Sequence, residues 1–176
     1  AYVMFSASTH PPDFRYKDSI VNAERRGEFV YNMATWALRH AVTRTSSIID
    51  PHVDEMRAVG LDPAPSRLLA TPRLAQSPIS FECRHYSTVT LPGHTPLTTH
   101  HMVIGRVVGV HIDDSVIRDG KIDIESIRPL ARMGYTDYTS VEKVFAMFTP
   151  EEERNRSSVG LDGGSDRKST RLNSSH

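Results

Sequence analysis

Two segments of the sequence decide the fold: ISFECRHYSTVTL, residues 79–91, and HMVIGRVVGVHI, residues 101–112. In the first segment, every second residue belongs to a mostly apolar face made of Ile79, Phe81, Cys83, His85, Ser87, Val89 and Leu91. The opposite face is polar and consists of Ser80, Glu82, Arg84, Tyr86, Thr88 and Thr90. This period of two predicts a half-buried β-strand with the polar face toward water.

The second segment predicts another strand. One face is apolar and is interrupted only by Arg106; its members are Met102, Ile104, Val108, Val110 and Ile112. The other face carries Gly105 and Gly109, and glycines that recur on one face of a strand often mark the close approach of a ligand or another backbone. A turn at Pro92-Gly93 makes the two strands a hairpin-like pair.

Shorter elements precede this pair. Residues 2–6 and 28–33 are β-prone and predict strands. Asp18 or Ser19 is expected to cap a helix at residues 20–26, and Gly27 is placed to end it. Together these elements indicate an α+β protein, or a small barrel with helical insertions.

Two more helices are expected before the long strands. Thr35 is predicted to cap one of them, with Trp36, Leu38 and Ala41 or Val42 facing inward. The other is a short helix at residues 53–59, stopped by Gly60. Prolines keep residues 62–78 irregular or edge-like.

The composition excludes several classes of protein. Lys plus Arg and Asp plus Glu both number 21, so the charge is balanced and gives no reason to expect a nucleic-acid or anionic-membrane partner. No apolar run is long enough for a membrane span, and no signal-peptide pattern opens the chain. One cysteine excludes an internal disulfide framework. We therefore expect a cytoplasmic protein with neither kind of partner.

The sequence predicts no metal site. His100 and His101 are neighbours on a strand and therefore point in opposite directions, and no cysteine pair or H-x-x-x-H spacing supports them. Cys83 lies on the apolar face of its strand, which favours a buried structural thiol over a nucleophile. No G-x-S-x-G, Walker or G-x-G-x-x-G sequence is present, which argues against hydrolase, P-loop and Rossmann proteins.

The most informative short segment is RYKDSIVN, residues 15–22. Lys17 precedes a helix N-terminus, where free backbone N–H groups and the helix dipole favour a phosphate. A solvated lysine beside an ordinary cap is the alternative interpretation. Arg132, with Tyr135 and Tyr138 nearby, has the residue types to clamp a planar anionic ligand, or it is a surface arginine packed on a core tyrosine.

Several motifs, in this order, resemble the flavin reductase-like, FMN-binding split-barrel family. They are Tyr2-Val3-Met4-Phe5-Ser6, Lys17-Asp18-Ser19-x-x-Asn22, Gly27-Glu28-Phe29-Val30-x-Asn32, Val53-Asp54-Glu55, Gly60-Leu61-x-Pro63-x-Pro65-Ser66, Ser77-Pro78-x-x-x-Glu82-Cys83-Arg84, His101-x-Val103-Ile104-Gly105-x-Val107-Val108 and Arg132-x-Gly134-x-x-x-Tyr138. Each motif is weak alone, and their shared order from residue 1 to about 148 makes them specific together.

The resemblance implies a mainly β, α+β fold: an antiparallel split barrel with short flanking helices, which forms a homodimer and binds FMN. It also implies an NAD(P)H-dependent flavin reductase, with NADH or NADPH as substrate and a flavin-dependent oxygenase or other electron acceptor as partner. The alternatives are a flavin electron carrier without nicotinamide activity and a structural domain that has lost its flavin. The implied cofactor-binding residues are Ser6, Lys17, Asp18, Ser19, Asn22, His101 and Arg132, and no catalytic residue is assigned.

The ends of the chain carry separate expectations. The resemblance implies that residues 1–150 are a partial split-barrel domain whose first strands are missing. Residues 151–176 are expected to form a disordered tail because they are polar and rich in charge. Residues 166–176, DRKSTRLNSSH, match an in-frame translation of a common sequencing adapter, so we expect them to be foreign to the natural protein.

Overall fold

The computed structural model describes residues 1–9, 14–46, 54–95 and 97–159, with side chains up to residue 155. The chain divides into two compact units, Ala1–Lys143 and Val144–His176. The second unit contains one described helix, α5 (Pro150–Val159). The predictions for residues 160–176, including the expected foreign segment, lie outside the described residues.

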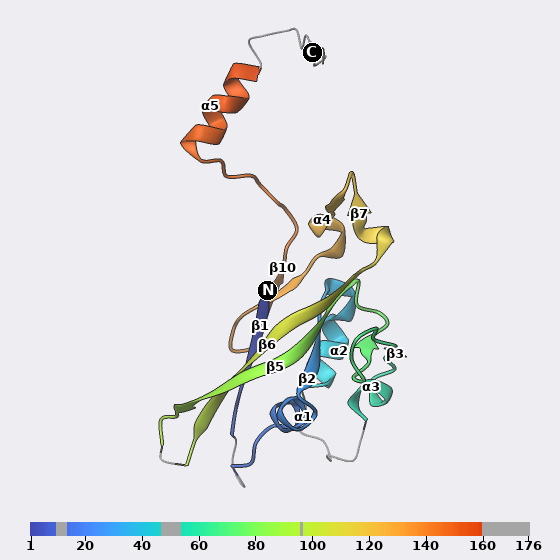
Figure 1. The fold of residues 1–176 in the computed structure, drawn as a ribbon, viewed down its shortest axis with the longest axis vertical. Coiled ribbons are helices and arrows are strands. Elements are labelled where there is room, and N and C mark those ends of the chain that lie inside the picture. Colours follow the sequence, from blue (N-terminus) through green and yellow to red (C-terminus); the bar gives the residue numbers. More distant parts are fainter. Residues whose placement is uncertain (10–13, 47–53, 96, 160–176) are drawn as a thin grey trace, which may run out of the picture. The chain divides into compact units, whose positions relative to one another are not determined.

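The first unit is built on an antiparallel sheet of four strands in the order β1-β6-β5-β2 (Figure 1). The two longest strands, β5 (Ile79–Pro92) and β6 (Thr99–Ile112), form the hairpin that the sequence predicts. β1 (Tyr2–Ser8) pairs with β6, and β2 (Glu28–Asn32) pairs with β5. The N-terminal strands are therefore the outer strands of this sheet.

Short elements connect and flank the sheet. The helices and turns of 3-10 helix are α1 (Asp18–Arg26), η1 (Trp36–Leu38), α2 (Arg39–Arg44), α3 (Glu55–Ala58), η2 (Asp114–Val116) and α4 (Ile124–Ile127). Three small two-stranded sheets pair β3 (Pro63–Ala64) with β4 (Arg73–Leu74), β7 (Ile117–Arg118) with β8 (Lys121–Ile122), and β9 (Leu130–Gly134) with β10 (Asp137–Ser140). Within the described residues, no helix is long and apolar enough to cross a membrane.

The core lies where α1 packs on one face of the sheet. Ile20 and Ala23 of α1 are buried together with Val103 of β6, and Phe5, Ala7 and Phe29 pack around them. Gly105 is necessary here, since a Cβ atom at this position would lie 2.4 Å from the Phe29 ring and 3.0 Å from Cys83 Cβ. The group that approaches this glycine is an aromatic side chain, not the ligand or backbone that the sequence predicts. Cys83 is fully buried, as predicted.

Two β-bulges change the predicted faces of the long strands. The pairing of β5 with β6 shifts between Glu82 and Cys83, and again between His85 and Ser87. Each shift exchanges the faces of the residues beyond it, because side chains alternate along a strand. The prediction of one continuous apolar face on each strand is therefore wrong.

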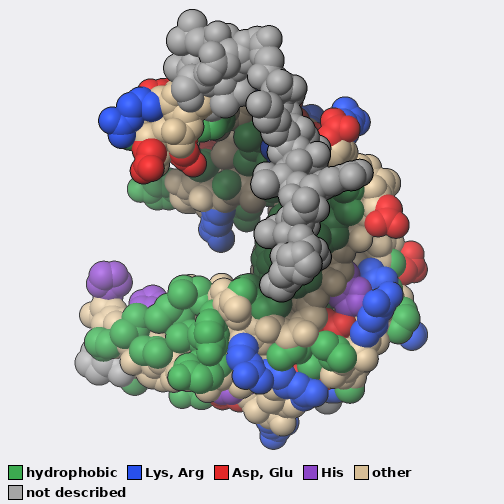
Figure 2. Space-filling model, turned by 45° about the horizontal axis from the view of Figure 1, so that its top comes forward, with side chains coloured by type: hydrophobic (Ala, Val, Ile, Leu, Met, Phe, Trp, Pro, Cys, Tyr) green, Lys and Arg blue, Asp and Glu red, His purple; other side chains and the backbone are tan. Residues whose placement is uncertain are grey.

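The predicted polar face of β5 is also wrong in its first half. Ser80 and Glu82 have no exposed surface. The chain segment 66–74 covers them, and its backbone amides bond to the Glu82 carboxylate. Another part of the sheet remains uncovered, on β1, β6 and the second half of β5. Several large apolar side chains are solvent-exposed there: Tyr2, Met4, Tyr86 and Val89. Hydrophobic side chains gather around the β5–β6 hairpin in Figure 2.

Local helix predictions are partly corrected. Lys17 is the N-cap of α1 and makes no side-chain cap bond, so neither Asp18 nor Ser19 caps it; Gly27 ends it in the left-handed conformation, as predicted. Thr35 makes no side-chain cap bond to the short η1 that follows it. Trp36 is 42% exposed instead of inward, and the guanidinium groups of Arg39 and Arg128 stack on its ring. Leu38 is buried as predicted.

The last predicted helix is shorter than expected. α3 covers Glu55–Ala58, and the Asp54 side chain caps it by accepting a hydrogen bond from the Arg57 backbone. Gly60 follows with φ +75°, which fits the predicted stop. The beginning of the predicted range, residue 53, lies outside the described residues. Residues 62–78 contain only the two-residue strands β3 and β4, in agreement with the effect of their prolines.

Candidate functional site

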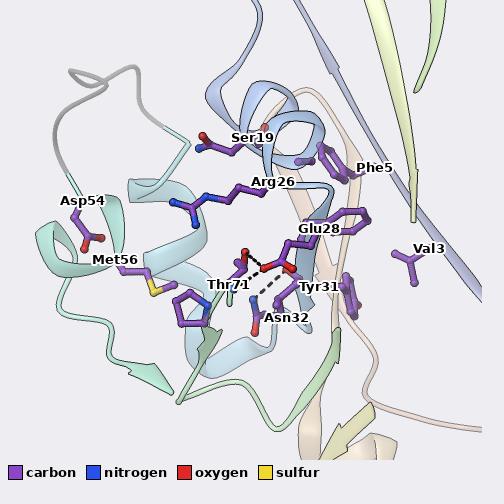
Figure 3. Close-up of a pocket in the computed structure, with 15 residues that line it drawn as sticks. Val3, Phe5, Ser19, Arg26, Glu28, Tyr31, Asn32, Asp54, Met56 and Thr71 are labelled. Carbon is purple, nitrogen blue, oxygen red and sulfur yellow. Dashed lines mark hydrogen bonds between the residues drawn. The ribbon is translucent and has the colours of Figure 1, made fainter. Parts of the chain in front are cut away.

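The first candidate site is a pocket of about 710 Å³ beside α1, which we call the helix pocket (Figure 3). Its wall is formed by α1, by the strands β1 and β2, and by parts of the chain around α3 and residues 71–72. Cofactor and small-molecule sites in proteins have volumes of roughly 300–1,000 Å³. The lining residues are Val3, Phe5, Ser19, Asn22, Ala23, Arg26, Glu28, Phe29, Val30, Tyr31, Asn32, Asp54, Met56, Thr71 and Pro72.

One side of the helix pocket is apolar. Val3 and Phe5 of β1 and Phe29 and Tyr31 of β2 belong to it, while Met56 lies on α3, away from these strands (Figure 3). The Phe5 and Phe29 rings meet edge to face with their centroids 5.2 Å apart. This arrangement fixes the wall and offers aromatic surface to a planar ligand.

The side formed by α1 is polar. Ser19, Asn22 and Arg26 lie three and four residues apart, and this spacing places them on one face of the helix. Arg26 extends from α1 into the pocket in Figure 3. Among the described residues, no carboxylate forms an ion pair with it. The pocket thus combines an aromatic wall with a cation that is available to an anionic ligand.

Sequence reasoning missed Arg26, although its spacing from Ser19 and Asn22 was a usable signal. Once Ser19 and Asn22 are assigned to one face of a helix, position 26 follows on that face. The family motif at this helix ends at Asn22 and does not include position 26.

A buried carboxylate supports the floor of the helix pocket. Glu28 accepts hydrogen bonds from the backbone N–H groups of Ala70 (2.9 Å) and Thr71 (2.8 Å), and from the Thr71 hydroxyl (3.1 Å). Arg84 pairs with its second oxygen at 3.1 Å. Burial raises the pKa of Glu28, but the bonds from Thr71 and Ala70 and the charge of Arg84 together hold it below its ordinary value. Glu28 is therefore ionised and holds Thr71 in place.

Two further side chains hold the same stretch of chain, residues 66–74, which we call the pinned loop. Glu82 accepts the backbone N–H groups of Arg67 and Leu68, both at 2.8 Å. Its Oε1 atom also lies 2.5 Å from Nε2 of His111. Asn32 accepts the backbone N–H of Leu74 at 2.8 Å. The pinned loop is thus fixed along its length by groups from β2 and β5.

Burial raises the pKa of Glu82, but the hydrogen bonds from His111, Arg67 and Leu68 lower it below its ordinary value. Because ionised Glu82 is only an acceptor, His111 Nε2 must carry the proton in their bond. Sequence reasoning placed Glu82 on a solvent-facing strand surface and so missed this network. No local signal identifies its partners, which lie 14 to 29 residues away.

The structure brings together some of the residues predicted to bind the cofactor. Ser19 and Asn22 line the helix pocket, while Lys17 and Asp18 stand at the start of the same helix. Glu55 of α3 is close enough to interact electrostatically with Lys17 and Asp18. Burial raises the pKa of Glu55, the negative charge of Asp18 raises it further, and the positive charge of Lys17 lowers it in part. A phosphate held by Lys17 would therefore be repelled by two nearby carboxylates, those of Asp18 and Glu55.

The remaining predicted residues lie elsewhere. Ser6 is exposed on the face of β1 opposite to Phe5, so it does not line the helix pocket. His101 is buried, with its ring nitrogens within hydrogen-bonding distance of the Thr90 and Thr99 hydroxyls. The Tyr16 ring packs on His101 at 4.3 Å, which places this histidine near the start of α1.

Arg132 belongs to the β9–β10 hairpin and is not part of the helix pocket. It donates a hydrogen bond to the Tyr135 carbonyl at 2.9 Å, and its guanidinium lies over the Tyr138 ring at 5.9 Å. The arginine thus lies over a tyrosine, but Tyr138 is 44% exposed and is not the core residue of the second interpretation. The role of Arg132 in binding a ligand stays a prediction.

Comparison with protein families identifies the chain. Residues 1–131 match the model of the flavin reductase like domain. The chain belongs to this family. A flavin reductase-like domain is the assignment that the ordered motifs of the sequence predicted.

Relatives and solved structures agree with this assignment. An uncharacterized protein of Halalkalibacterium halodurans is 31% identical to this flavin reductase-like domain over 145 residues, which are 82% of this chain and 69% of the relative. The crystal structure of nitrilotriacetate monooxygenase component B from Bacillus cereus superposes with a TM-score of 0.72 and 25% identity, covering 82% of this chain and 71% of that one.

A Shewanella frigidimarina structure with a split barrel domain shares the fold at a TM-score of 0.66 and 22% identity, covering 83% of this chain and 70% of the other. The predicted fold class, a mainly β antiparallel split barrel with short helices, is thus confirmed.

Proposed function

We propose that this flavin reductase-like domain binds FMN and acts as a flavin reductase with NADH or NADPH as the reductant. The observation that carries the proposal is the helix pocket, in which an aromatic wall faces a polar helix face with a cation. FMN has a flat, largely apolar ring system at one end and a phosphate at the other. Its two ends need the two kinds of surface that this pocket offers.

The residues at the polar side have distinct roles in this proposal. Lys17 supplies positive charge to the FMN phosphate, and Ser19 and the free N–H groups of the first turn of α1 donate hydrogen bonds. Asn22 lies one turn further on the same face as Ser19 and contacts the ribityl chain. Asp18 orients the loop, since a carboxylate repels a phosphate. Arg26 adds a second cation further along the pocket.

The residues at the apolar side exclude water. Phe5, Phe29 and Tyr31 surround the position of the ring, and Glu28 and the pinned loop keep Thr71 and Pro72 at the rim. When bound, FMN supplies the redox chemistry, accepting a hydride from the nicotinamide and passing its two electrons to an acceptor. The protein contributes position, shielding and charge.

The open apolar face of the sheet supports a further part of the proposal, namely a homodimer. Tyr2, Met4 and Tyr86 are each more than half exposed, and the Tyr2 and Tyr86 rings meet edge to face at 5.4 Å. Soluble proteins seldom leave such surface uncovered, and the matching surface of a second copy is the partner that we propose for it. An oxygenase or another protein that takes electrons from reduced flavin is the proposed functional partner.

The first experiment tests the phosphate site. Charge-assisted contacts to a phosphate contribute about 1.5–3 kcal/mol. Lys17→Ala should therefore weaken FMN binding by roughly ten- to a hundredfold, measured by fluorescence titration, because about 1.4 kcal/mol corresponds to a factor of ten. Riboflavin, which lacks the phosphate, should bind the variant and the parent equally. Unchanged FMN affinity, or an equal loss for riboflavin, would show that Lys17 does not contact the phosphate.

The second experiment tests the reaction. Purified protein is mixed with FMN and either NADH or NADPH, and oxidation of the nicotinamide is followed at its absorbance band. Turnover supports a flavin reductase. A flavin absorbance band in the protein as purified, before FMN is added, together with no nicotinamide oxidation identifies an electron carrier. The lack of both identifies a domain that does not use flavin.

A further inference from the structure

A second pocket, of about 360 Å³, is also lined by residues of the pinned loop. The two pockets have no lining residue in common. The second is mostly polar, and Arg67 and Arg73, near the two ends of the pinned loop, both line it together with His111 and Asp113. We call it the arginine pocket.

Both arginines are without a carboxylate partner among the described residues. Arg73 donates its Nε–H to the Pro65 carbonyl at 3.3 Å, a bond that leaves its charge uncompensated. Other arginines do have a carboxylate partner: Arg84 pairs with Glu28, and Arg118 pairs with Asp123. Two cations that line one pocket without a counter-ion form a ready site for an anion.

The arginine pocket is held in a fixed shape. Glu82 binds the Arg67 backbone N–H and the His111 ring with the same oxygen, so it fixes two lining residues at once. Asn32 holds the Leu74 backbone beside Arg73. Glu82 is fully buried, and burying a carboxylate is costly unless every bond is made. Because the backbone that carries the two arginines is already fixed, less entropy is lost when a ligand binds.

The negative groups at the arginine pocket do not cancel the two cations. Asp113 is the one carboxylate among its lining residues, and it accepts the Ser115 backbone N–H at 2.9 Å. The negative charge of buried Glu82 is already compensated by hydrogen bonds from His111 and from the backbone amides of the pinned loop. An anion would therefore bind beside the guanidinium groups and away from Asp113.

We propose that the arginine pocket binds a phosphate-bearing anion. Arginine presents paired N–H donors in a planar fork that matches the oxygens of a phosphate group. Two sources of this chemistry are the phosphates of the nicotinamide dinucleotide, an assignment that rests on the proposed function, and a free phosphoanion.

The test uses inorganic pyrophosphate as the probe and isothermal titration calorimetry at low ionic strength. Arg67→Gln/Arg73→Gln should weaken pyrophosphate binding by about a hundredfold, roughly a factor of ten for each charge-assisted contact. The matched control is Arg25→Gln/Arg44→Gln, which removes two exposed arginines of the same unit and should leave binding within about twofold. All four arginine sites are at the surface or half-buried, and equal thermal melting confirms that the variants fold.

A third variant tests the location of the anion. Asp113→Asn keeps an oxygen that accepts the Ser115 N–H and removes the one lining carboxylate, so pyrophosphate should bind a few-fold more tightly. Absence of pyrophosphate binding to the parent, or equal binding to the parent and Arg67→Gln/Arg73→Gln, would overturn the proposal. So would weaker binding to Asp113→Asn.

Competition distinguishes the two sources. If NAD⁺ or NADP⁺ displaces pyrophosphate from the parent protein, the dinucleotide is the source of the phosphate; if neither does, the source is a free phosphoanion. Both conclusions require that Arg67→Gln/Arg73→Gln has lost pyrophosphate binding. The reductase assay with FMN and NADH is run on the same samples. A protein without reductase activity can still bind pyrophosphate, so failure of the proposed function and failure of the anion site are distinguished.

Discussion

Replacing Glu82 with glutamine should destabilise the domain strongly, because this carboxylate accepts three hydrogen bonds in a fully buried position. In Glu82→Gln, the side-chain oxygen can still accept from Arg67 and His111, but without the negative charge. The new NH2 group then faces the Leu68 N–H, so two donors oppose each other in the interior.

The magnitude follows from these bonds. A hydrogen bond to a charged group contributes about 1.5–3 kcal/mol and one between neutral groups about 1, so two weakened bonds lose about 1–4 kcal/mol. The buried N–H of Leu68 without a partner costs about 1–3 kcal/mol more. We expect the free energy of unfolding to fall by about 2–7 kcal/mol and the melting temperature by roughly 5–25 °C.

The assay is urea unfolding followed by circular dichroism, with Glu24→Gln as the control. Glu24 is exposed on α1, and its substitution should change stability by less than about 0.5 kcal/mol. Hydrogen exchange gives the local readout, since the amides of Arg67 and Leu68 should lose protection in Glu82→Gln. A loss of stability below about 1 kcal/mol, or unchanged protection of these two amides, would refute the reasoning.

Three further predictions concern packing, charge and pH. Gly105→Ala should cost about 1–3 kcal/mol of stability by chemical denaturation, because the new Cβ atom would lie 2.4 Å from an aromatic ring of β2; a neutral result would mean that the ring moves freely. Glu55→Gln removes a negative charge near Lys17 and should tighten FMN binding by about two- to fivefold at low salt, with riboflavin unaffected; weaker FMN binding would contradict this. Glu28 and Glu82 have lowered folded-state pKa values, so their stabilisation is complete above the unfolded value near 4.5 and is lost as the pH falls through the folded values; a melting temperature that stays constant from pH 6 to pH 3 would disprove the assignment.

The sequence predicted the parts of the site that depend on neighbours along the chain. Ser19 and Asn22 were assigned to one helix face from their spacing of three, and both line the helix pocket. Lys17 stands at the start of that helix, as expected. Ser6 was predicted to contact the same cofactor, and the alternation of β1 places it on the face away from the pocket.

The pinned loop shows what the sequence could not reveal. Glu82 alternates with apolar residues and looks like a solvent-facing position, yet the loop covers it, and its bonds reach residues up to 29 positions away. The β-bulges at Val108 on β6 and at Tyr86 on β5 exchange the faces of the long strands, and pairing in three dimensions decides where such a shift occurs.

The sequence by itself determined the two long strands, the helix that Gly27 ends, the buried Cys83 and the family, because periodicity, turn residues and ordered motifs are local properties of the chain. The tertiary structure alone decided that Glu28, Asn32 and Glu82 hold one loop whose residues line two pockets. It also decided that Arg26 lines the first pocket, and that Arg67 and Arg73 share the second. The physical reason is that a buried carboxylate is stable only where distant backbone amides converge on it, and folding, not sequence proximity, brings those amides together.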